Sequence, residues 1–353
     1  MRVLVTGSCG LIGSEAVHYY ASRKNEVWGI DNNMRRYFFG PGGDTGSMRN
    51  ILSASFRNYT HKEIDIRDRA SVLEVFRAVN PHFIIHTAAQ PSHDWAAKEP
   101  FTDFDVNACG TLNLLEGLRQ FCPNSVFVFL STNKVYGDAP NHLPLEEMEM
   151  RYEYDVKMRG RGIDENLSVD GCLHSIFGAS KLAADIMVQE YGRYFGLKTA
   201  AFRGGCLTGS RHAGVELHGF VSYLVECAVR GNRYSIFGYK GKQVRDQIDS
   251  SDVIQALELF RQNPRTGEYY NLGGCYENSA SVLELIAKLK ERFGLTVLST
   301  YVDQARKGDH ICYYSDMSKF KKHYPEFRIQ KSLDTILEEM VISAQEKLTK
   351  KAA

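Results

Sequence analysis

Phe177 and Lys181 are the residues of this chain whose types and spacing bear most directly on chemistry, within the segment His174-Ser-Ile-Phe177-Gly-Ala-Ser-Lys181. In a helix, side chains at this separation lie one turn apart on the same face. A tyrosine at the first position could exchange a proton, because a neighbouring ammonium lowers the pKa of a phenol from its usual value of about 10. Phe177 has no such proton. A catalytic pair at this spacing would therefore lack its acid–base member here.

The N-terminal segment predicts a strand, a glycine turn and a helix. Arg2–Thr6 is a short run rich in apolar and β-branched residues, glycines follow at positions 7, 10 and 13, and a helical stretch continues through Tyr20. Glycines at this spacing let the backbone turn tightly, approach a pyrophosphate closely and pack the helix against the sheet. This predicts a dinucleotide-binding turn.

A second predicted strand, residues 26–31, ends at Asp31. A carboxylate about 20 residues beyond the glycines is where a dinucleotide ribose would be bound. It favours NAD over NADP, because it would repel a 2′-phosphate. Arg35 and Arg36 lie close in sequence and keep NADP open as the alternative.

Strand and helix signals alternate through the first two thirds of the chain. Further strands are predicted at 61–66, 83–88, 126–131, 198–203 and 269–272, with amphipathic helices between most of them. This pattern predicts an α/β fold with a Rossmann-type, doubly wound parallel sheet. After Arg203 the alternation becomes irregular, which predicts a smaller, C-terminal substrate-binding lobe. We expect residues 1–203 plus about 245–272 to form the dinucleotide-binding domain, and about 204–244 and 273–353 to form the lobe.

Composition narrows the classes of function. The formal net charge of +1 over 353 residues supplies no long-range field, so neither nucleic acid nor a membrane surface is implied as a partner. The eight cysteines show no CxxC pair and no metal-ligand spacing, so reduced thiols, a cytoplasmic protein and no metal are expected. No apolar run approaches the roughly 20 residues that a membrane span needs.

Several further motifs carry a family resemblance. They are Asp65-Ile66, Thr87-Ala88-Ala89, Asn107 before Gly110-Thr111, and Ser131-Thr-Asn-Lys-Val-Tyr-Gly137. Together with the glycine turn and the 177–181 segment, they resemble an extended short-chain dehydrogenase/reductase, in the branch of NAD-dependent nucleotide-sugar epimerases and dehydratases, over essentially the whole chain. Within that branch, Thr132-Asn133-Lys134, the insertion through Arg151-Tyr152 and Asp164-Glu165, and residues 241–246 most resemble the CDP-paratose 2-epimerase (CDP-tyvelose epimerase) subfamily.

The resemblance implies NAD as cofactor and a nucleotide-diphosphate sugar as substrate of the lobe. The residues that it assigns to NAD are Gly7, Cys9, Gly10, Leu11, Ile12, Gly13, Asp31, Asn32, Asp65, Ile66, Thr87, Ala88, Ala89, Asn107, Leu130 and Lys181. The residues assigned to the substrate are Gln90, Asp94, Thr132, Asn133, Arg203, Arg245, Arg306 and Asp309. Arg245, just before a strand-like segment ending in Asp252, and Arg306 match the arginines that bind the diphosphate and nucleoside, for which the guanidinium fork is suited.

The triplet 132–134 also separates two chemistries. The related 4,6-dehydratases carry Thr-Asp-Glu there, because removal of water needs an acid and a base. An amide does not titrate and an ammonium is no base at neutral pH, so Asn133 and Lys134 disfavour dehydration. The resemblance instead implies epimerisation at C2 by transient oxidation to a keto-sugar, with Lys181 as the stabilising cation and Thr132 bonded to a sugar hydroxyl.

Several residues could replace the phenol that Phe177 lacks. His174 precedes the predicted helix, Tyr136 matches a tyrosine that is usually structural in the family, and Cys206 could move a proton beside a ketone. His93 and Asp94 fall where the family contacts the sugar. We rank His93, and Thr132 acting with water, above the others.

Three readings of the function remain open on the sequence. The first is the C2 epimerase, and the second is a related enzyme that epimerises another carbon or decarboxylates a uronic sugar. The third is a non-catalytic NAD- or nucleotide-sugar-binding protein. Helices predicted at 111–121 and 181–195 match those that pair across the dimer in the resembled family, so a homodimer is expected.

Overall fold

The computed structural model describes residues 1–210, 219–305 and 308–352. By its internal contacts the chain divides into two compact units, and each is built from separate stretches of sequence. Unit 1 comprises residues 1–135, 175–204 and 253–270, and unit 2 comprises residues 136–174, 205–252 and 271–353.

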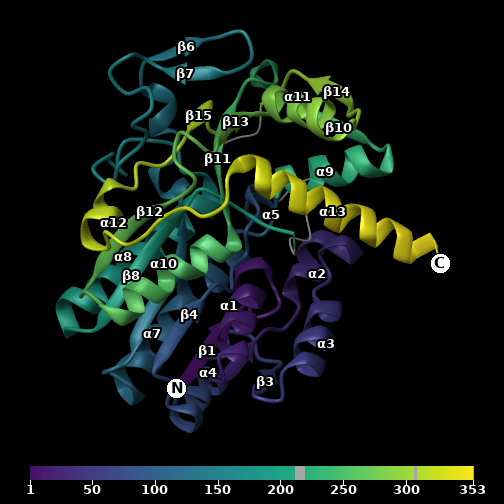
Figure 1. Cartoon of the computed structure of the whole chain (residues 1–353). Coiled ribbons are helices and arrows are strands. Elements are labelled where there is room, and N and C mark those ends of the chain that lie inside the picture. Colours follow the sequence, from purple (N-terminus) through teal and green to yellow (C-terminus); the bar gives the residue numbers. More distant parts are fainter. Residues whose placement is uncertain (211–218, 306–307, 353) are drawn as a thin grey trace. The chain divides into compact units, whose positions relative to one another are not determined.

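Unit 1 contains a seven-stranded sheet in the order β12-β8-β5-β4-β1-β2-β3 (Figure 1). The neighbours from β8 to β3 pair in parallel. The strands are β1 Arg2–Thr6, β2 Glu26–Ile30, β3 Tyr59–Lys62, β4 Phe83–His86, β5 Val126–Thr132, β8 Lys198–Gly204 and β12 Glu268–Leu272. The predicted Rossmann-type fold is confirmed. The third strand lies earlier than predicted, because residues 64–66 leave the ladder and Ile66 packs in the core instead.

Helices cover both faces of this sheet. They are α1 Leu11–Ser22, α2 Met34–Phe39, α3 Gly46–Ser55, α4 Arg69–Val79, α5 His93–Lys98, α6 Pro100–Phe104, α7 Gly110–Phe121, α8 Ser175–Phe195 and α10 Ser250–Gln262. One core, with Leu4, Ile84 and Phe127 at its centre, lies beneath α4, α7 and α8. On the other face, Tyr20 of α1 stacks edge-on against Phe83 and donates a hydrogen bond to Glu258 of α10.

The described part of unit 2 combines small sheets with α-helices. Its strands are β6 Leu145–Glu147, β7 Tyr152–Tyr154, β9 Cys206–Thr208, β10 Arg233–Phe237, β11 Val244–Asp249, β13 Ser279–Ser281, β14 Leu298–Val302 and β15 Cys312–Tyr313. Its helices are α9 Phe220–Arg230, α11 Val282–Phe293, α12 Ser318–His323 and α13 Leu333–Ala352. The core of this unit lies between α9, α11, α13 and β10. Strand β11 is the central strand of a four-stranded sheet, in which it pairs with β13, β15 and β9.

The units differ in two places from the boundaries predicted from the sequence. Residues 136–174 belong to unit 2, because their hairpin is anchored there, for example by the Tyr154 hydroxyl on the carbonyl of Cys312. Residues 245–252 also belong to unit 2, because β11 pairs with β9, β13 and β15. The strand expected to end at Asp252 ends at Asp249, and Ser250 begins α10.

Within the described residues, no helix has both the length and the apolar character needed to cross a membrane. In the same part of the chain, no group of three or more His, Cys, Asp or Glu side chains is arranged to hold a metal ion.

Candidate active site

The glycine turn between β1 and α1 is built by close backbone contacts. Gly7 has a φ of 67°, and a Cβ at Gly13 would lie 2.0 Å from the carbonyl oxygen of Gly7. The N–H of Gly10 donates to that same oxygen at 3.0 Å. Gly10 is the N-cap of α1 and has no side chain to cap it. The first N–H groups of the helix can therefore meet a phosphate, as the sequence predicts.

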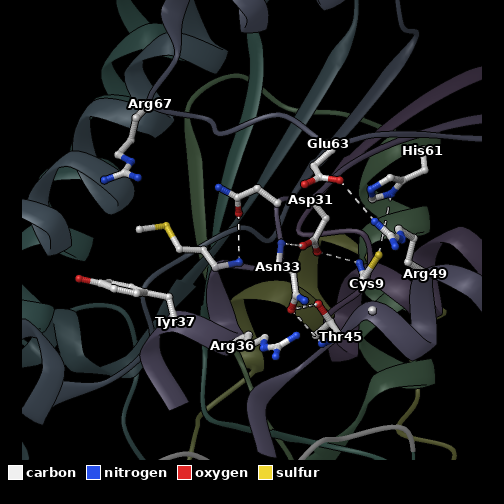
Figure 2. Close-up of a pocket in the computed structure, with 13 residues that line it drawn as sticks. Cys9, Asp31, Asn33, Arg36, Tyr37, Thr45, Arg49, His61, Glu63 and Arg67 are labelled. Atoms are coloured by element: carbon white, nitrogen blue, oxygen red, sulfur yellow. Dashed lines mark hydrogen bonds and ion pairs between the residues drawn. The ribbon is translucent and has the colours of Figure 1, made fainter. Parts of the chain in front are cut away.

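Asp31 is held at the end of β2 in a pocket of about 700 Å³ (Figure 2). One carboxylate oxygen accepts the N–H of Cys9 at 3.0 Å, and the other accepts the N–H of Asn33 at 2.8 Å. The carboxylate is thereby fixed beside the glycine turn, where the sequence predicts that it binds a ribose. This pocket and the turn fit the adenosine and pyrophosphate parts of NAD.

Three arginines line the same pocket, and each has an acidic partner. Arg36 pairs with Asp44 at 3.1 Å, Arg49 with Glu63 at 3.4 Å, and Arg67 with Asp65 at 2.7 Å. These carboxylates offset the guanidinium charge that a 2′-phosphate would need. Asp65, which the resemblance assigns to NAD, is thus engaged with Arg67.

Asn107 joins the loop after β4 to α8. It lies in a π-helical turn, Asp105–Cys109, accepts the N–H of Gln90 and donates to the Gln90 carbonyl, each at 3.0 Å. Its amide also bonds the hydroxyl of Ser180 at 3.1 Å. The Gln90 side chain, predicted to bind substrate, is buried and donates to Asp103 at 2.7 Å. Thr87, the first residue after β4, donates to the carbonyl of Thr6 at the end of β1.

Lys181 is buried in α8, and its ammonium points at the end of β5. Nζ donates to the carbonyl of Leu130 at 2.7 Å and lies 4.0 Å from the centre of the Phe129 ring. Burial lowers the pKa of Lys181 to about 7, although the carboxylates of Asp185 and Asp103 act in the opposite direction. A lysine in this state can be a cation or a proton carrier near neutral pH.

Phe177 lies one turn before Lys181 on α8, and it is also buried. Its ring meets the imidazole of His93 edge-on, with ring centres 5.0 Å apart. His93 is the first residue of α5, and its Nδ1 lies 2.8 Å from the hydroxyl oxygen of Ser175. The structure therefore places a histidine against the position where a tyrosine would supply the proton. No motif in the sequence identifies Ser175 as a functional residue. Its only signal is that serine is common at the start of a helix.

Thr132 is the last residue of β5, and Asn133 begins the short 3-10 helix that follows it in the same unit. The Thr132 hydroxyl accepts the N–H of Lys134 at 3.2 Å, and Asn133 is buried. Arg203, predicted to bind substrate, forms a buried ion pair with Asp185 at 3.0 Å, and Asp185 also accepts the hydroxyl of Ser131 at 2.5 Å. Asp94 is exposed on α5.

The remaining predicted residues belong to unit 2. Arg245 lies within β11, and its guanidinium bonds Asp309 and the carbonyl of His310, each at 2.5 Å. Burial acts to lower the pKa of Arg245, but Asp309, Cys206 and Cys312 together act in the opposite direction, and the pKa is raised overall. Arg306 lies outside the described residues.

Three alternative proton carriers also lie in unit 2. The ring of His174 bonds the carbonyl of Val169 at 2.7 Å, which gives it a packing role. Tyr136 is buried and donates to Asn271 at 2.8 Å. Cys206 begins β9, where it pairs with Gln247 of β11.

Comparison with known proteins agrees with this geometry. Residues 3–273 match the NAD dependent epimerase/dehydratase family. The CDP-paratose 2-epimerase of Salmonella typhi is 32% identical over 326 residues, covering 90% of this chain and 92% of that protein. The dTDP-glucose 4,6-dehydratase of Haemophilus influenzae is 26% identical over 346 residues, covering 95% and 90%. The structure of Thermus thermophilus UDP-glucose 4-epimerase in complex with NAD is similar with a TM-score of 0.78 at 26% identity, covering 98% and 99%.

The parallel sheet, the glycine turn and the buried lysine define a Rossmann-type enzyme of the short-chain dehydrogenase/reductase kind. The chain belongs to the NAD-dependent epimerase/dehydratase family. Its cofactor is NAD, which the pocket at Asp31 fits.

Proposed function

We propose that the protein is an epimerase that acts on a nucleotide-diphosphate sugar at C2. The observation that carries the choice of epimerase over dehydratase is the pair at 133 and 134, an amide and an ammonium beside the end of β5. An amide does not titrate and an ammonium is no base at neutral pH, so the pair lacks the base that removal of water needs. The choice of C2 and of a CDP-sugar rests on the similarity to CDP-paratose 2-epimerase.

NAD, when bound, takes a hydride from the sugar carbon and returns it to the opposite face of the transient ketone. The chain must hold the sugar hydroxyl, accept its proton and stabilise the developing negative oxygen. Lys181 supplies the cation, because its ammonium is buried and fixed by the Leu130 carbonyl. A fixed charge in a water-poor site stabilises an alkoxide strongly. Thr132 holds the sugar hydroxyl by a hydrogen bond.

His93 is the proposed proton carrier. Its ring contacts Phe177, which occupies the position of the missing phenol, and an imidazole titrates in the range that proton transfer at neutral pH requires. Thr132 acting with water is the alternative route for the same proton. In unit 2, Arg245 is proposed to bind the diphosphate with Asp309 as its internal partner. The same role is proposed for Arg306 on sequence grounds alone.

The test is turnover of a panel of CDP-, UDP-, dTDP- and GDP-sugars by the purified protein. We expect a C2 epimer as product and transient absorbance of reduced nicotinamide. His93→Gln should lower kcat at least 100-fold, in keeping with loss of an acid–base group. Tight nucleotide-sugar binding without any reduction of the cofactor across the panel would refute the enzymatic proposal and leave a binding protein.

Phe177→Tyr is the companion experiment. If His93 carries the proton, the added hydroxyl at position 177 should push the His93 ring out of its present place and lower kcat. A gain in rate would mean instead that the site works as a tyrosine enzyme that has lost its phenol. His93→Gln in the Phe177→Tyr background separates the two, since a tyrosine enzyme would no longer depend on His93.

We also propose that the protein forms a homodimer through α7 and α8, the helices expected from the sequence, with α6 beside α8. Helix α8 contacts both α7 and α6, and α6 and α8 carry apolar side chains left open to solvent in the single chain. Phe101 is 88% exposed, Phe104 47%, and Ile186 44%. Exposed apolar side chains gathered on neighbouring helices are typical of a protein interface. The cytoplasmic location expected from the sequence stays a prediction.

A further inference from the structure

Ser175 begins α8 with an unusual backbone. Its φ is 61°, in the left-handed region that glycine adopts freely and other residues seldom adopt. Residues held in this region at functional sites are kept there by surrounding contacts that offset the strain. The contacts of the Ser175 hydroxyl therefore show what this conformation achieves.

Among the residues that the structure describes, the hydroxyl oxygen of Ser175 contacts Gly178 and His93. It accepts the N–H of Gly178 at 3.3 Å, which is one of the first-turn N–H groups of α8 that lack a partner inside the helix. It also lies 2.8 Å from Nδ1 of His93. The same oxygen thus caps the active-site helix and contacts the histidine.

Phe177 restricts the orientation of the His93 imidazole by a second contact. Its buried ring meets that of His93 at an interplanar angle of 68°. Ser175 and Phe177 lie two residues apart in the first turn of α8. The helix therefore contacts His93 twice, at Nδ1 through Ser175 and at the imidazole ring through Phe177. Lys181 follows one turn later, so the cation and the histidine are positioned by one rigid element.

We propose that Ser175 is a positioning residue that holds His93 with its proton on Nδ1, leaving Nε2 as the nitrogen that exchanges a proton with the sugar hydroxyl. This inference rests on the proposed function. As the sugar is oxidised, the O–H bond of its hydroxyl breaks and the proton forms a bond to Nε2. The proton returns to the same oxygen when the ketone is reduced. Throughout, Ser175 accepts from Nδ1–H and neither gains nor loses a proton.

The ring state can be read without turnover. In ¹⁵N-histidine-labelled protein, with His93→Gln to assign its signal among the eleven histidines, we expect neutral His93 to carry its proton on Nδ1. In Ser175→Ala the Nε2–H form should become the main one. A wild-type His93 that carries its proton on Nε2 would overturn the proposal, and so would an unchanged ring in Ser175→Ala. Absence of turnover with every sugar would refute the proposed function but would not affect this result.

The kinetic test uses three substitutions at 175. Ser175→Ala and Ser175→Gly should each lower kcat by about 10- to 100-fold with little change in KM, and both should move the limb of the pH profile that His93→Gln abolishes. Ser175→Thr keeps the hydroxyl and should recover most of kcat, even at a lower Tm. Equal loss of activity in Ser175→Thr and Ser175→Ala would overturn the role of the hydroxyl.

Glycine separates strain from chemistry. Ser175→Gly relieves the positive φ and should have a higher Tm than Ser175→Ala, while being as slow. Lys24→Gly is the matched control, because Lys24 is exposed and has a φ of 60° outside the site. It should gain stability and keep wild-type kcat. If Ser175→Gly recovered wild-type kcat, the serine would be structural only.

Discussion

At the scale of single residues, the candidate site depends on the buried ammonium of Lys181. Lys181 is almost fully buried between Phe129 and the Leu130 carbonyl, and it keeps the place expected of it although its usual tyrosine partner is absent. A desolvated ammonium is costly for the fold but effective for chemistry, because no water screens it. In the proposed function, this buried ammonium lies where the negative oxygen of the sugar forms.

The pKa of Lys181 predicts a pH-dependent stability. Its folded pKa of about 7 lies below the value of about 10.4 expected in the unfolded chain, so between these values the unfolded state binds more protons. The cost of the buried charge is therefore largest below pH 7 and fades as the pH rises toward 10. Lys181→Met should stabilise the protein at pH 6.5, by on the order of a few kcal/mol, and gain much less at pH 9.5.

Urea unfolding at the two pH values measures this effect. Lys198→Met is the control, because Lys198 is exposed and bonds only the Asn124 carbonyl among the contacts described. A Lys181→Met gain that is equal at pH 6.5 and 9.5 would show that the lysine titrates normally in the folded protein.

At the scale of elements, close backbone approaches set the positions of the functional groups. The glycine turn brings α1 onto β1 and β2, and the first turn of α8 brings Phe177 and Ser175 to α5. In unit 2, β11 carries Asp246 between Gly205 and Gly273, where any side chain would collide with the carboxylate. Such contacts tolerate very few substitutions.

Gly13→Ala should abolish NAD binding and destabilise the protein by more than about 2 kcal/mol, because its Cβ would lie 2.0 Å from the Gly7 carbonyl. Gly10→Ala is the graded control, since its Cβ would lie 3.3 Å from the same oxygen and needs only a small shift. Fluorescence titration with NAD and thermal unfolding measure the two effects. Equal affinity in both variants would contradict the packing argument.

Asp246 predicts a second pH effect, of opposite sign. Burial raises its pKa to about 6, against the N–H groups of Ser315 and Cys275, so the folded state binds more protons than the unfolded state between about pH 4 and 6. Stability therefore falls as the pH rises through this range. Asp246→Asn should remove about 2–3 kcal/mol of this fall, while Asp170→Asn at an exposed position should not. Unfolding curves at pH 4.5 and 7 measure the change in unfolding free energy between the two pH values. The same change in wild type and Asp246→Asn would refute this prediction.

At the scale of the whole molecule, two units with separate cores share one chain that crosses between them several times. The dinucleotide turn, Lys181 and His93 all belong to unit 1, and Arg245 with Asp309 belongs to unit 2. Cofactor chemistry and the proposed diphosphate site are thus carried by different units.

The proposed dimer gives a prediction at this scale. Light scattering should show a dimer, and Ile186→Asp on α8 should give a folded monomer, because a charge in the interface is left unpaired. Ile342→Asp is the matched control, since Ile342 is 50% exposed on α13, which belongs to unit 2 and takes no part in the proposed interface. A wild-type monomer at micromolar concentration would contradict the proposal.

The sequence by itself determined the architecture of unit 1, its glycine turn, its carboxylate after β2 and the helix that carries Lys181. These features follow from local periodicity and from residues near each other along the chain, where strand, turn and helix preferences act directly. The same local logic exposed Phe177 as the anomaly. It could not tell which of His93, His174, Cys206 or Thr132 lies against it.

Only the tertiary structure decided that question, because His93 and Ser175 are separated by 82 positions in sequence and meet only where α5 packs on α8. The same reason explains why Arg203 faces Asp185 and why residues 136–174 join unit 2, since both depend on long-range packing that no local pattern encodes. The pKa of Lys181 is likewise a property of the folded environment. A lysine is recognisable in a sequence, but its burial, and so its charge at neutral pH, is set by what the fold places around it.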